Sequence, residues 1–363
     1  MNAYAVNGPL RVGLIGCGHI AATHVAAWRQ SDLADIAGVF DVNMDAAQRF
    51  AGRFGVTTVY PTVAAAVAGA DIVDDCSPPA AHRENALAAL RAGRHYLVEK
   101  PMVLARADLD EILAAREAAG RQLCVIHNLK YSDGVLAASR WVADGRIGQV
   151  LALDRVFLTD PSTDRMLRMP NHWSRRLPGG RWVETLPHEL YLIHHFLGPL
   201  EVASVVALPG ETSTPASSEA DPATAPEVAV IMRGPSAVAT LRYSSRNRTN
   251  QRRLTLYGSE GTILVDILAG SATLLRQKDS AWVRAVGGQT LDAATTLARM
   301  VPDRLTRLAG RLRHRTAHSA LIRDFARSVR GDGPPPVSLD EIAYVVDKTE
   351  EIGAMISASA RGA

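Results

Sequence analysis

The sequence has no long apolar run, little net charge and few cysteines, and each shortage excludes a class of protein. No run reaches the ~18 apolar residues that a membrane-spanning helix needs, and residues 1–9 lack the pattern of a secretory signal. A net charge of only +3 argues against nucleic acid as the main partner. The scattered Cys17, Cys76 and Cys124 form no CxxC pair, so neither a disulfide framework nor a structural zinc site is expected. We therefore expect a cytoplasmic protein.

The length and composition fit two globular domains. The chain has 363 residues, of which 47% are hydrophobic and 21% are charged, and this is too long for one small core. The pattern of apolar runs changes near residue 128. We therefore place one domain at residues 1–127 and a second domain at residues 128–363.

The first domain alternates short β-branched runs with alanine-rich helical stretches. Such alternation predicts an α/β fold with a doubly wound parallel sheet. The predicted strands are residues 11–16, 35–41, 70–77, 95–100 and 122–128, with a further short one possible at 56–60. The predicted helices are residues 20–30, 44–54, 62–69, 81–92 and 107–119.

The second domain has strands in quick succession, joined by short connectors that contain glycine. This spacing is typical of hairpins and predicts a large, mostly antiparallel open sheet. The strands are expected at residues 150–159, 202–208, 228–233, 237–244, 252–257, 262–267, 272–276 and 282–285. Helices are expected near residues 134–144, 190–197, 318–329 and 339–357, and a surface loop at 209–226.

A glycine-rich loop follows the first strand. Gly16, Gly18 and Ala21 form a GxGxxA pattern between a strand and a helix, where the glycines let a pyrophosphate approach the backbone. The next strand ends in Asp41, which is placed to accept hydrogen bonds from the adenosine ribose. Its charge would repel a 2′-phosphate, which favours NAD over NADP. The alternative is that Asp41 only caps the helix that begins near Met44.

Lys100 stands at the carboxyl end of a buried strand, within Glu99-Lys100-Pro101. Ligands of open α/β sheets bind at this edge. An ammonium group there can donate to a substrate oxygen and stabilise the negative charge that develops on it. The alternative is a surface lysine paired with Glu99.

A proton acceptor is expected in the second domain. Glu184 and His188 are four residues apart, so a helix would place both on one face, where the carboxylate could orient the imidazole. Pro187 opposes this, because proline breaks or kinks a helix. His194 and His195 form no HExxH pattern, so we expect no metal site.

These residues together resemble the glucose–fructose oxidoreductase / inositol dehydrogenase (Gfo/Idh/MocA) family over nearly the whole chain. The motifs that carry the resemblance are the glycine loop with Asp41, Ser77-Pro78-Pro79 with His82, Glu99-Lys100-Pro101, residues 179–188 and residues 257–262. Two positions depart from the family pattern GGGxxxDxxxH. Pro178 replaces its first glycine, and Glu184 replaces its aspartate.

The resemblance implies a role for each matching residue. Lys100, His188 and Glu184 would be catalytic. The cofactor would lie against Gly16, Cys17, Gly18, His19, Ile20, Asp41, Ser77, Pro78, His82, Glu99, Lys100 and Asn128. The substrate would meet Lys100, His172, Trp173, Arg181, Glu184 and His188.

The implied activity is hydride transfer between NAD(P) and a secondary alcohol or ketone of a sugar, cyclitol or nucleotide-linked sugar. Two alternatives stay open, namely an NAD-dependent redox-neutral glycosidase and a non-catalytic nucleotide-sensing regulator. An open sheet with one uncovered face also predicts a homo-oligomer, either a dimer or a tetramer. A basic stretch at residues 299–315 fits an amphipathic helix with its arginines in water, or a docking surface for an acidic partner.

Overall fold

The computed structural model describes residues 8–169, 172–208, 225–276 and 316–361, and the chain divides into two compact units. Unit 1 contains Met1–Tyr131 and Arg315–Glu350, and unit 2 contains Ser132–His314 and Glu351–Ala363. The sequence predicts a single boundary near residue 128, whereas a late segment of the chain returns to unit 1. The predicted strand at 282–285, the basic stretch at 299–315 and most of the predicted loop at 209–226 lie outside the described residues.

Unit 1 is built on a five-stranded sheet with the order β2-β1-β3-β4-β5, in which every neighbouring pair is parallel. This confirms the predicted doubly wound sheet. The strands are β1 (Leu10–Ile15), β2 (Ala34–Phe40), β3 (Ile72–Asp75), β4 (His95–Val98) and β5 (Leu123–Val125). The possible strand at 56–60 is reduced to one isolated bridge between Val39 and Val59.

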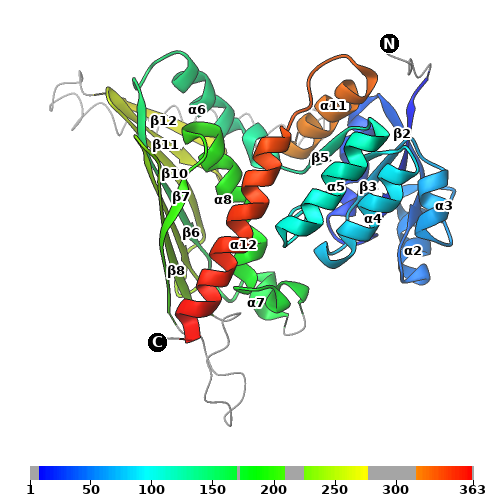
Figure 1. The fold of residues 1–363 in the computed structure, drawn as a ribbon, viewed down its shortest axis with the longest axis horizontal. Helices are drawn as coiled ribbons and strands as arrows, with labels where there is room; N and C mark the ends of the chain where they lie inside the picture. Colours follow the sequence, from blue (N-terminus) through cyan, green and yellow to red (C-terminus); the bar gives the residue numbers. More distant parts are fainter. Residues whose placement is uncertain (1–7, 170–171, 209–224, 277–315, 362–363) are drawn as a thin grey trace, which may run out of the picture. The chain divides into compact units, whose positions relative to one another are not determined.

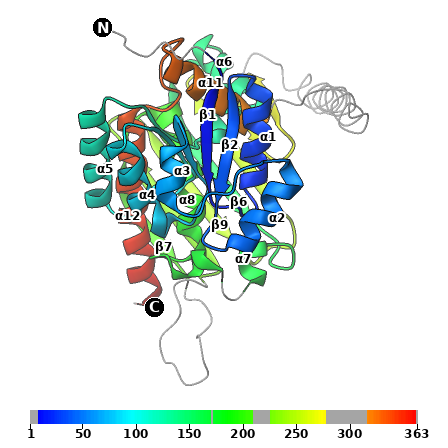
Figure 2. The same ribbon diagram turned by 90° about the vertical axis from the view of Figure 1, so that its right-hand side faces the viewer.

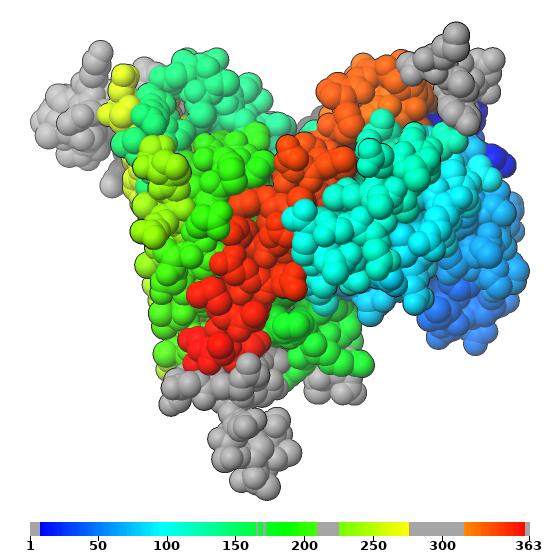
Figure 3. All heavy atoms as spheres, in the orientation of Figure 1, coloured from blue at the N-terminus to red at the C-terminus, as the bar shows by residue number. Residues whose placement is uncertain are grey.

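Helices cover both faces of this sheet. Those of unit 1 are α1 (Ala21–Ser31), α2 (Met44–Phe54), α3 (Val63–Ala68), α4 (Pro79–Arg91), α5 (Arg106–Ala119) and α11 (Ala317–Arg330). Helix α1 packs against α11, and α4 packs against both α3 and α5 (Figure 2). Helices α4 and α5, coloured cyan, form an outer surface of the unit (Figure 3).

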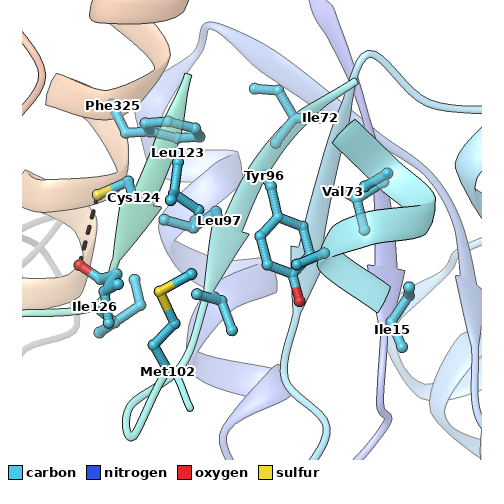
Figure 4. Packing of buried hydrophobic residues seen from close by; sticks show 14 of the residues in the cluster. Ile15, Ile72, Val73, Tyr96, Leu97, Met102, Leu123, Cys124, Ile126 and Phe325 are labelled. Atoms are coloured by element: carbon cyan, nitrogen blue, oxygen red, sulfur yellow. Dashed lines mark hydrogen bonds between the residues drawn. The ribbon is translucent and has the colours of Figure 1, made fainter. Parts of the chain in front are cut away.

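The core of unit 1 includes the helix that returns from the end of the chain. Phe325 of α11 is fully buried and lies beside Leu123 and Cys124 of β5 (Figure 4). Such burial of a large aromatic side chain contributes roughly 1.5–3 kcal/mol. The sequence places this helix in the second domain only because it follows the antiparallel strands along the chain.

Unit 2 contains a seven-stranded sheet with the order β12-β11-β10-β6-β9-β8-β7. Its neighbouring strands are antiparallel except for β6 and β9, so the predicted mostly antiparallel sheet is confirmed. The strands are β6 (Val150–Leu158), β7 (Glu201–Ala207), β8 (Glu227–Arg233), β9 (Val238–Ser244), β10 (Gln251–Gly258), β11 (Gly261–Asp266) and β12 (Ser271–Arg276).

One face of this sheet is covered by helices and the other carries exposed side chains. Helices α6 (Asp133–Ala143) and α8 (Arg181–Leu197) pack on the same side of the sheet (Figure 1). Residues alternate between buried and exposed along β8, as the period of a strand requires. On strands of this sheet, large apolar side chains that are 39–56% exposed include Val206, Ile231, Val238, Tyr257, Leu264 and Leu275. In the part of the chain that the structure describes, no helix is both long and apolar enough to cross a membrane.

The start of α12 (Leu339–Arg361) is anchored in unit 1 by a buried ion pair. Glu341 accepts hydrogen bonds from Nδ1 of His127 at 2.6 Å and from Nζ of Lys130 at 2.7 Å. Burial alone would raise the pKa of Glu341, but these two partners lower it to about 2. These two contacts of Glu341 therefore connect the turn after β5 to α12.

We expect Glu341→Gln to lower the free energy of unfolding by about 3 kcal/mol near neutral pH, because it leaves buried cations without their carboxylate. A depressed pKa stabilises the fold fully above the ordinary value of 4.5, and this contribution is lost as the pH falls toward 2. The difference between the proteins should therefore shrink over that range. Urea unfolding across the range measures it, with the exposed neighbour Asp340→Asn as control. An equal difference at every pH would contradict the assignment.

Candidate active site

The glycine loop after β1 has the geometry of a phosphate-binding turn. Gly16 has a φ of +86°, and a Cβ atom there would lie 2.7 Å from the backbone nitrogen of Ser77. Only glycine fits such a close approach between two loops at the carboxyl edge of the sheet. A Cβ atom at Gly18 would meet open space, so the loop is exposed at the position where the fingerprint brings a pyrophosphate close.

The helix after this loop begins without a side-chain cap. Ile20 precedes α1, makes no capping hydrogen bond, and is followed by no acidic residue in the first turn. Asn43, Thr62 and Thr316 cap α2, α3 and α11, whereas α4, α5, α6 and α8 begin without a side-chain cap, as α1 does. The uncapped amides and the positive end of the α1 dipole therefore fit the pyrophosphate of a dinucleotide.

Asp41 follows β2 and bonds to the glycine loop. Its carboxylate accepts from the backbone nitrogens of Cys17 and Asn43, both at 2.8 Å. The side-chain cap of α2 is supplied by Asn43, so capping is not the task of Asp41. Asp41 is only half-buried and keeps acceptor capacity at the edge of the loop, as ribose binding requires.

We expect Asp41→Ser to lower the preference for NAD over NADP by about 10- to 100-fold, the worth of hydrogen bonds to a charged acceptor. The substitution removes both the carboxylate and its repulsion of a 2′-phosphate. The ratio of kcat/KM for the two cofactors measures the effect. Asp45→Ser, which removes an exposed charge from the first turn of α2, is the matched control. An unchanged ratio in Asp41→Ser would contradict the ribose role.

The loop after β3 is held by buried side chains. Asp75 accepts from the backbone nitrogen of Ser77 at 2.9 Å and from the hydroxyl of Tyr96 at 2.6 Å. His82 is fully buried, with Nε2 at 2.7 Å from the carbonyl oxygen of Ser77 and Nδ1 at 3.0 Å from that of Pro101. His82 therefore joins the Ser77-Pro78 loop to the turn that follows Lys100.

Lys100 follows β4 at the same edge of the sheet as Gly16, Asp41 and Ser77. It is partly exposed, whereas Glu99 beside it is buried. Oε2 of Glu99 accepts from the backbone nitrogen of Lys100 at 3.1 Å, and Oε1 lies 3.0 Å from Nε2 of His24. Glu99 therefore faces the interior of unit 1, and its carboxylate fixes the backbone at Lys100.

The remaining predicted cofactor residues lie near this edge or behind it. His19 is exposed in the glycine loop. Asn128 begins the short helix η1 (Asn128–Tyr131), where its side-chain nitrogen lies 3.4 Å from Nδ1 of His318.

In unit 2, one continuous helix carries Glu184 and His188. Helix α8 runs from Arg181 to Leu197 with Pro187 inside it. The sequence predicts a break at this proline, but the helix continues because its apolar face is buried against the sheet, and such packing outweighs local propensity. Glu184 and His188 therefore stand one turn apart on the same helix.

His188 has a partner that the sequence pattern does not indicate. Its Nδ1 lies 2.8 Å from the hydroxyl of Tyr191, which is fully buried one turn further along α8. The two rings meet edge to face, with centroids 5.7 Å apart. The hydroxyl therefore orients the imidazole through Nδ1.

The segment before α8 is shaped by two glycines and a buried arginine. Gly179 and Gly180 have φ values of +82° and +67°, so both glycines that remain from the family pattern are needed by the backbone. Arg181 is 1% exposed, bonds to Asp164 and stacks on the ring of Trp182. Arg181 is therefore buried in this segment and holds it through its contacts with Asp164 and Trp182.

The two aromatic residues predicted to meet the substrate form part of the same loop. His172 caps the short helix η2 (Trp173–Arg176) through the backbone nitrogen of Ser174, and its ring lies 5.4 Å from that of Trp173. Both side chains are partly exposed. They can therefore be reached by a sugar ring.

In each unit, residues that the motifs missed contact the predicted site residues or their neighbours. His24, Asp74, Asp75 and Tyr191 are fully buried and polar, and each contacts a residue that the motifs do identify or one of its supports. The sequence contains one indication of these residues, which is the pair Asp74-Asp75 at the end of an apolar strand. Carboxylates are rarely buried without a partner, so this pair indicates buried polar partners.

Comparisons with known proteins identify the family. Residues 10–127 match the oxidoreductase family with an NAD-binding Rossmann fold, and residues 135–264 match the GFO/IDH/MocA C-terminal domain. The chain therefore belongs to the GFO/IDH/MocA family of oxidoreductases. This confirms the predicted family, the NAD cofactor of the Rossmann domain and the class of enzyme.

The individual relatives have low sequence identity to this chain or match only part of it. D-apiose dehydrogenase of Paraburkholderia graminis is 33% identical over 137 residues, which are 37% of this chain and 36% of that protein. Inositol 2-dehydrogenase of Pseudomonas savastanoi pv. phaseolicola is 27% identical over 218 residues, 59% of this chain and 62% of that protein. The chain thus spans between about a third and three fifths of these curated relatives.

Among solved structures, a levoglucosan dehydrogenase in complex with NADH and levoglucosan has the same fold. Its TM-score is 0.76 at 21% identity, and the match covers 97% of each chain. At this identity the likeness concerns the fold.

Proposed function

We propose that this protein is an NAD-dependent dehydrogenase or reductase that acts on a secondary alcohol or ketone of a sugar, cyclitol or nucleotide-linked sugar. The observation that carries the proposal is the set of loops at one edge of the unit 1 sheet. The glycine loop, Asp41 and Lys100 each follow a different strand of the same parallel sheet. Relatives named as dehydrogenases of apiose and inositol support the substrate class.

The residues have complementary tasks in this reaction. Bound NAD would accept a hydride from the carbinol carbon in the oxidation. Bound NADH would give a hydride to the ketone carbon in the reduction. Lys100 donates a hydrogen bond to the reacting oxygen and stabilises its developing charge. His188 takes the hydroxyl proton through Nε2, while Tyr191 holds Nδ1. Glu184, one turn before His188 on α8, supports the positive charge that the imidazole gains.

The test is a screen of the purified full chain with NAD against free sugars, cyclitols and nucleotide sugars, with formation of NADH followed by absorbance. The proposal predicts turnover with at least one polyol of these classes and a strong preference for NAD. Release of a glycosidic leaving group without bulk NADH would favour the redox-neutral glycosidase. Binding of NADH without any turnover would favour the regulator.

We also propose that the first domain binds the nucleotide and that the second binds substrate and pairs with a second copy. The exposed apolar side chains on the open face of the unit 2 sheet support the pairing. Light scattering should give a dimer or tetramer, and Ile231→Lys in the middle of β8 should shift the mass toward one chain. A single-chain mass for the unaltered protein would contradict the proposal.

A further inference from the structure

A group of buried and partly buried polar side chains surrounds Glu99 in unit 1. Its members come from α1, the end of β3, the residue after β4, η1 and α11, so they are far apart in the sequence. They are His24, Trp28, Asp74, Glu99, Asn128 and His318. Glu99 and Asn128 are also among the residues predicted to meet the cofactor, whereas the other four are not among the predicted site residues.

His24 stands at the centre of this group and bridges two carboxylates. Its Nδ1 lies 2.9 Å from both oxygens of Asp74, and its Nε2 lies 3.0 Å from Oε1 of Glu99. A carboxylate offers only acceptors, so each ring nitrogen must donate, and a ring that donates from both nitrogens is an imidazolium. The side chains of His24 and Asp74 are 0% exposed, and that of Glu99 is 10% exposed.

The groups that face His24 favour this charged state. Burial alone would lower the pKa of His24, but the Asp74 carboxylate raises it well above its ordinary value. Cys76 also lies against the ring, and burial raises the pKa of its thiol, which keeps it neutral. Burial alone would raise the pKa of Glu99, but the hydrogen bond from His24 and the nearby ring of His318, whose Nε2 lies 3.7 Å from Oε1, hold it well below its usual range.

The network ends at the proposed catalytic lysine. Oε1 of Glu99 is held by His24, and Oε2 accepts from the backbone nitrogen of Lys100 at 3.1 Å. On the far side, the indole of Trp28 donates to Asp74 at 2.7 Å. A chain of hydrogen bonds therefore runs from the interior of α1 to the backbone from which the Lys100 side chain extends.

We propose that His24 is a positioning residue for Lys100, acting through Glu99 as the buried cation that holds the carboxylate against the Lys100 amide. The inference rests on the catalytic role of Lys100 under the proposed function. Without the imidazolium, the carboxylates of Asp74 and Glu99 would be left buried with less compensation. Glu99 would then take up a proton or turn away, and the backbone at Lys100 would lose its anchor.

A metal ion is the competing explanation for these groups. His24, Glu99 and His318 bring one ligand-type atom each within 4.8 Å of one another. Both nitrogens of His24, however, are already at hydrogen-bonding distance from carboxylates, which satisfies the ring without an ion. The test includes a determination of metal content for this reason.

The decisive experiment introduces His24→Gln into the unaltered protein and into Lys100→Ala. In the unaltered protein we expect kcat to fall by about 10- to 100-fold, the cost of misplacing a reacting group by about an ångström. The dissociation constant of NADH should change by less than about threefold, because no phosphate or ribose contact is touched. In Lys100→Ala, the same substitution should have no further effect on the residual single-turnover rate, because His24 acts only through the lysine.

The outcomes separate the inference from the proposed function. If Lys100→Ala alone leaves turnover intact, the proposed function fails. If His24→Gln lowers the rate equally in both backgrounds, or in neither, the positioning role is wrong while the role of Lys100 stands. Stoichiometric zinc in the purified protein that is lost in His24→Gln would also overturn it. His95→Gln, which removes a partly buried histidine of unit 1 outside this network, is the control and should leave kcat unchanged.

A gentler variant covers the case in which His24→Gln does not fold. Trp28→Phe keeps most of the buried volume but removes the indole donor to Asp74. We expect kcat to fall by about two- to fivefold in the unaltered protein, a fraction of the worth of one hydrogen bond to a charged group, and not at all in Lys100→Ala. Equal losses in both backgrounds would again show a purely structural role.

Discussion

Lys100→Met should lower turnover by about 100- to 1,000-fold, the usual cost of removing one donor that stabilises a developing oxyanion. Methionine keeps the length and the apolar stem of lysine but cannot donate a hydrogen bond. Because the glycine loop and Asp41 are unaltered, the dissociation constant of NADH should stay within about threefold of the original. Steady-state kinetics and a titration of NADH fluorescence on the same sample measure both quantities.

Lys100→Arg is the informative companion variant. It retains the positive charge but presents a planar guanidinium in a different place, so we expect partial activity between that of the original and that of Lys100→Met. Unchanged turnover in Lys100→Met would remove the lysine from the mechanism. A loss of NADH binding equal to the loss of turnover would instead assign it to cofactor binding.

The second large effect is expected for His188→Asn, which should lower turnover by about 100- to 10,000-fold, the range for a lost general acid or base. Asparagine can still bond to the Tyr191 hydroxyl but cannot exchange a proton. The limb of the pH–rate profile that reports the base should therefore disappear. Profiles of kcat/KM for the two proteins make the comparison.

His195→Gln is the matched control for this variant. It lies on the same helix, and its Nε2 is 2.8 Å from the hydroxyl of Ser139. It should leave both the rate and the pH profile unchanged. A pH–rate profile of His188→Asn that keeps the limb that reports the base would show that another group accepts the proton.

The local part of the site could be predicted from the sequence. Gly16, Asp41 and Lys100 each follow a short apolar run, and the topology of a parallel sheet brings the ends of such runs to one edge. These expectations depend only on neighbours in the chain. The same is true of the second sheet, whose short glycine-containing connectors indicate hairpins.

The buried polar contacts between residues far apart in the sequence could not be predicted in this way. His24 meets Glu99 from 75 residues away, and Glu341 bonds to His127 across 214 residues. No local pattern specifies such pairs, because packing in three dimensions decides which buried polar groups meet. The course of α8 through Pro187 is another case in which burial of an apolar face outweighs the preference of one residue.

The most direct test of the central claim is a crystal structure of the protein with NADH and a substrate found by the screen. The account predicts that Nζ of Lys100 and Nε2 of His188 both lie within about 3.2 Å of one substrate oxygen. The carbon that bears this oxygen should lie about 3–3.5 Å from C4 of the nicotinamide. A substrate bound with either side chain directed elsewhere would contradict the account.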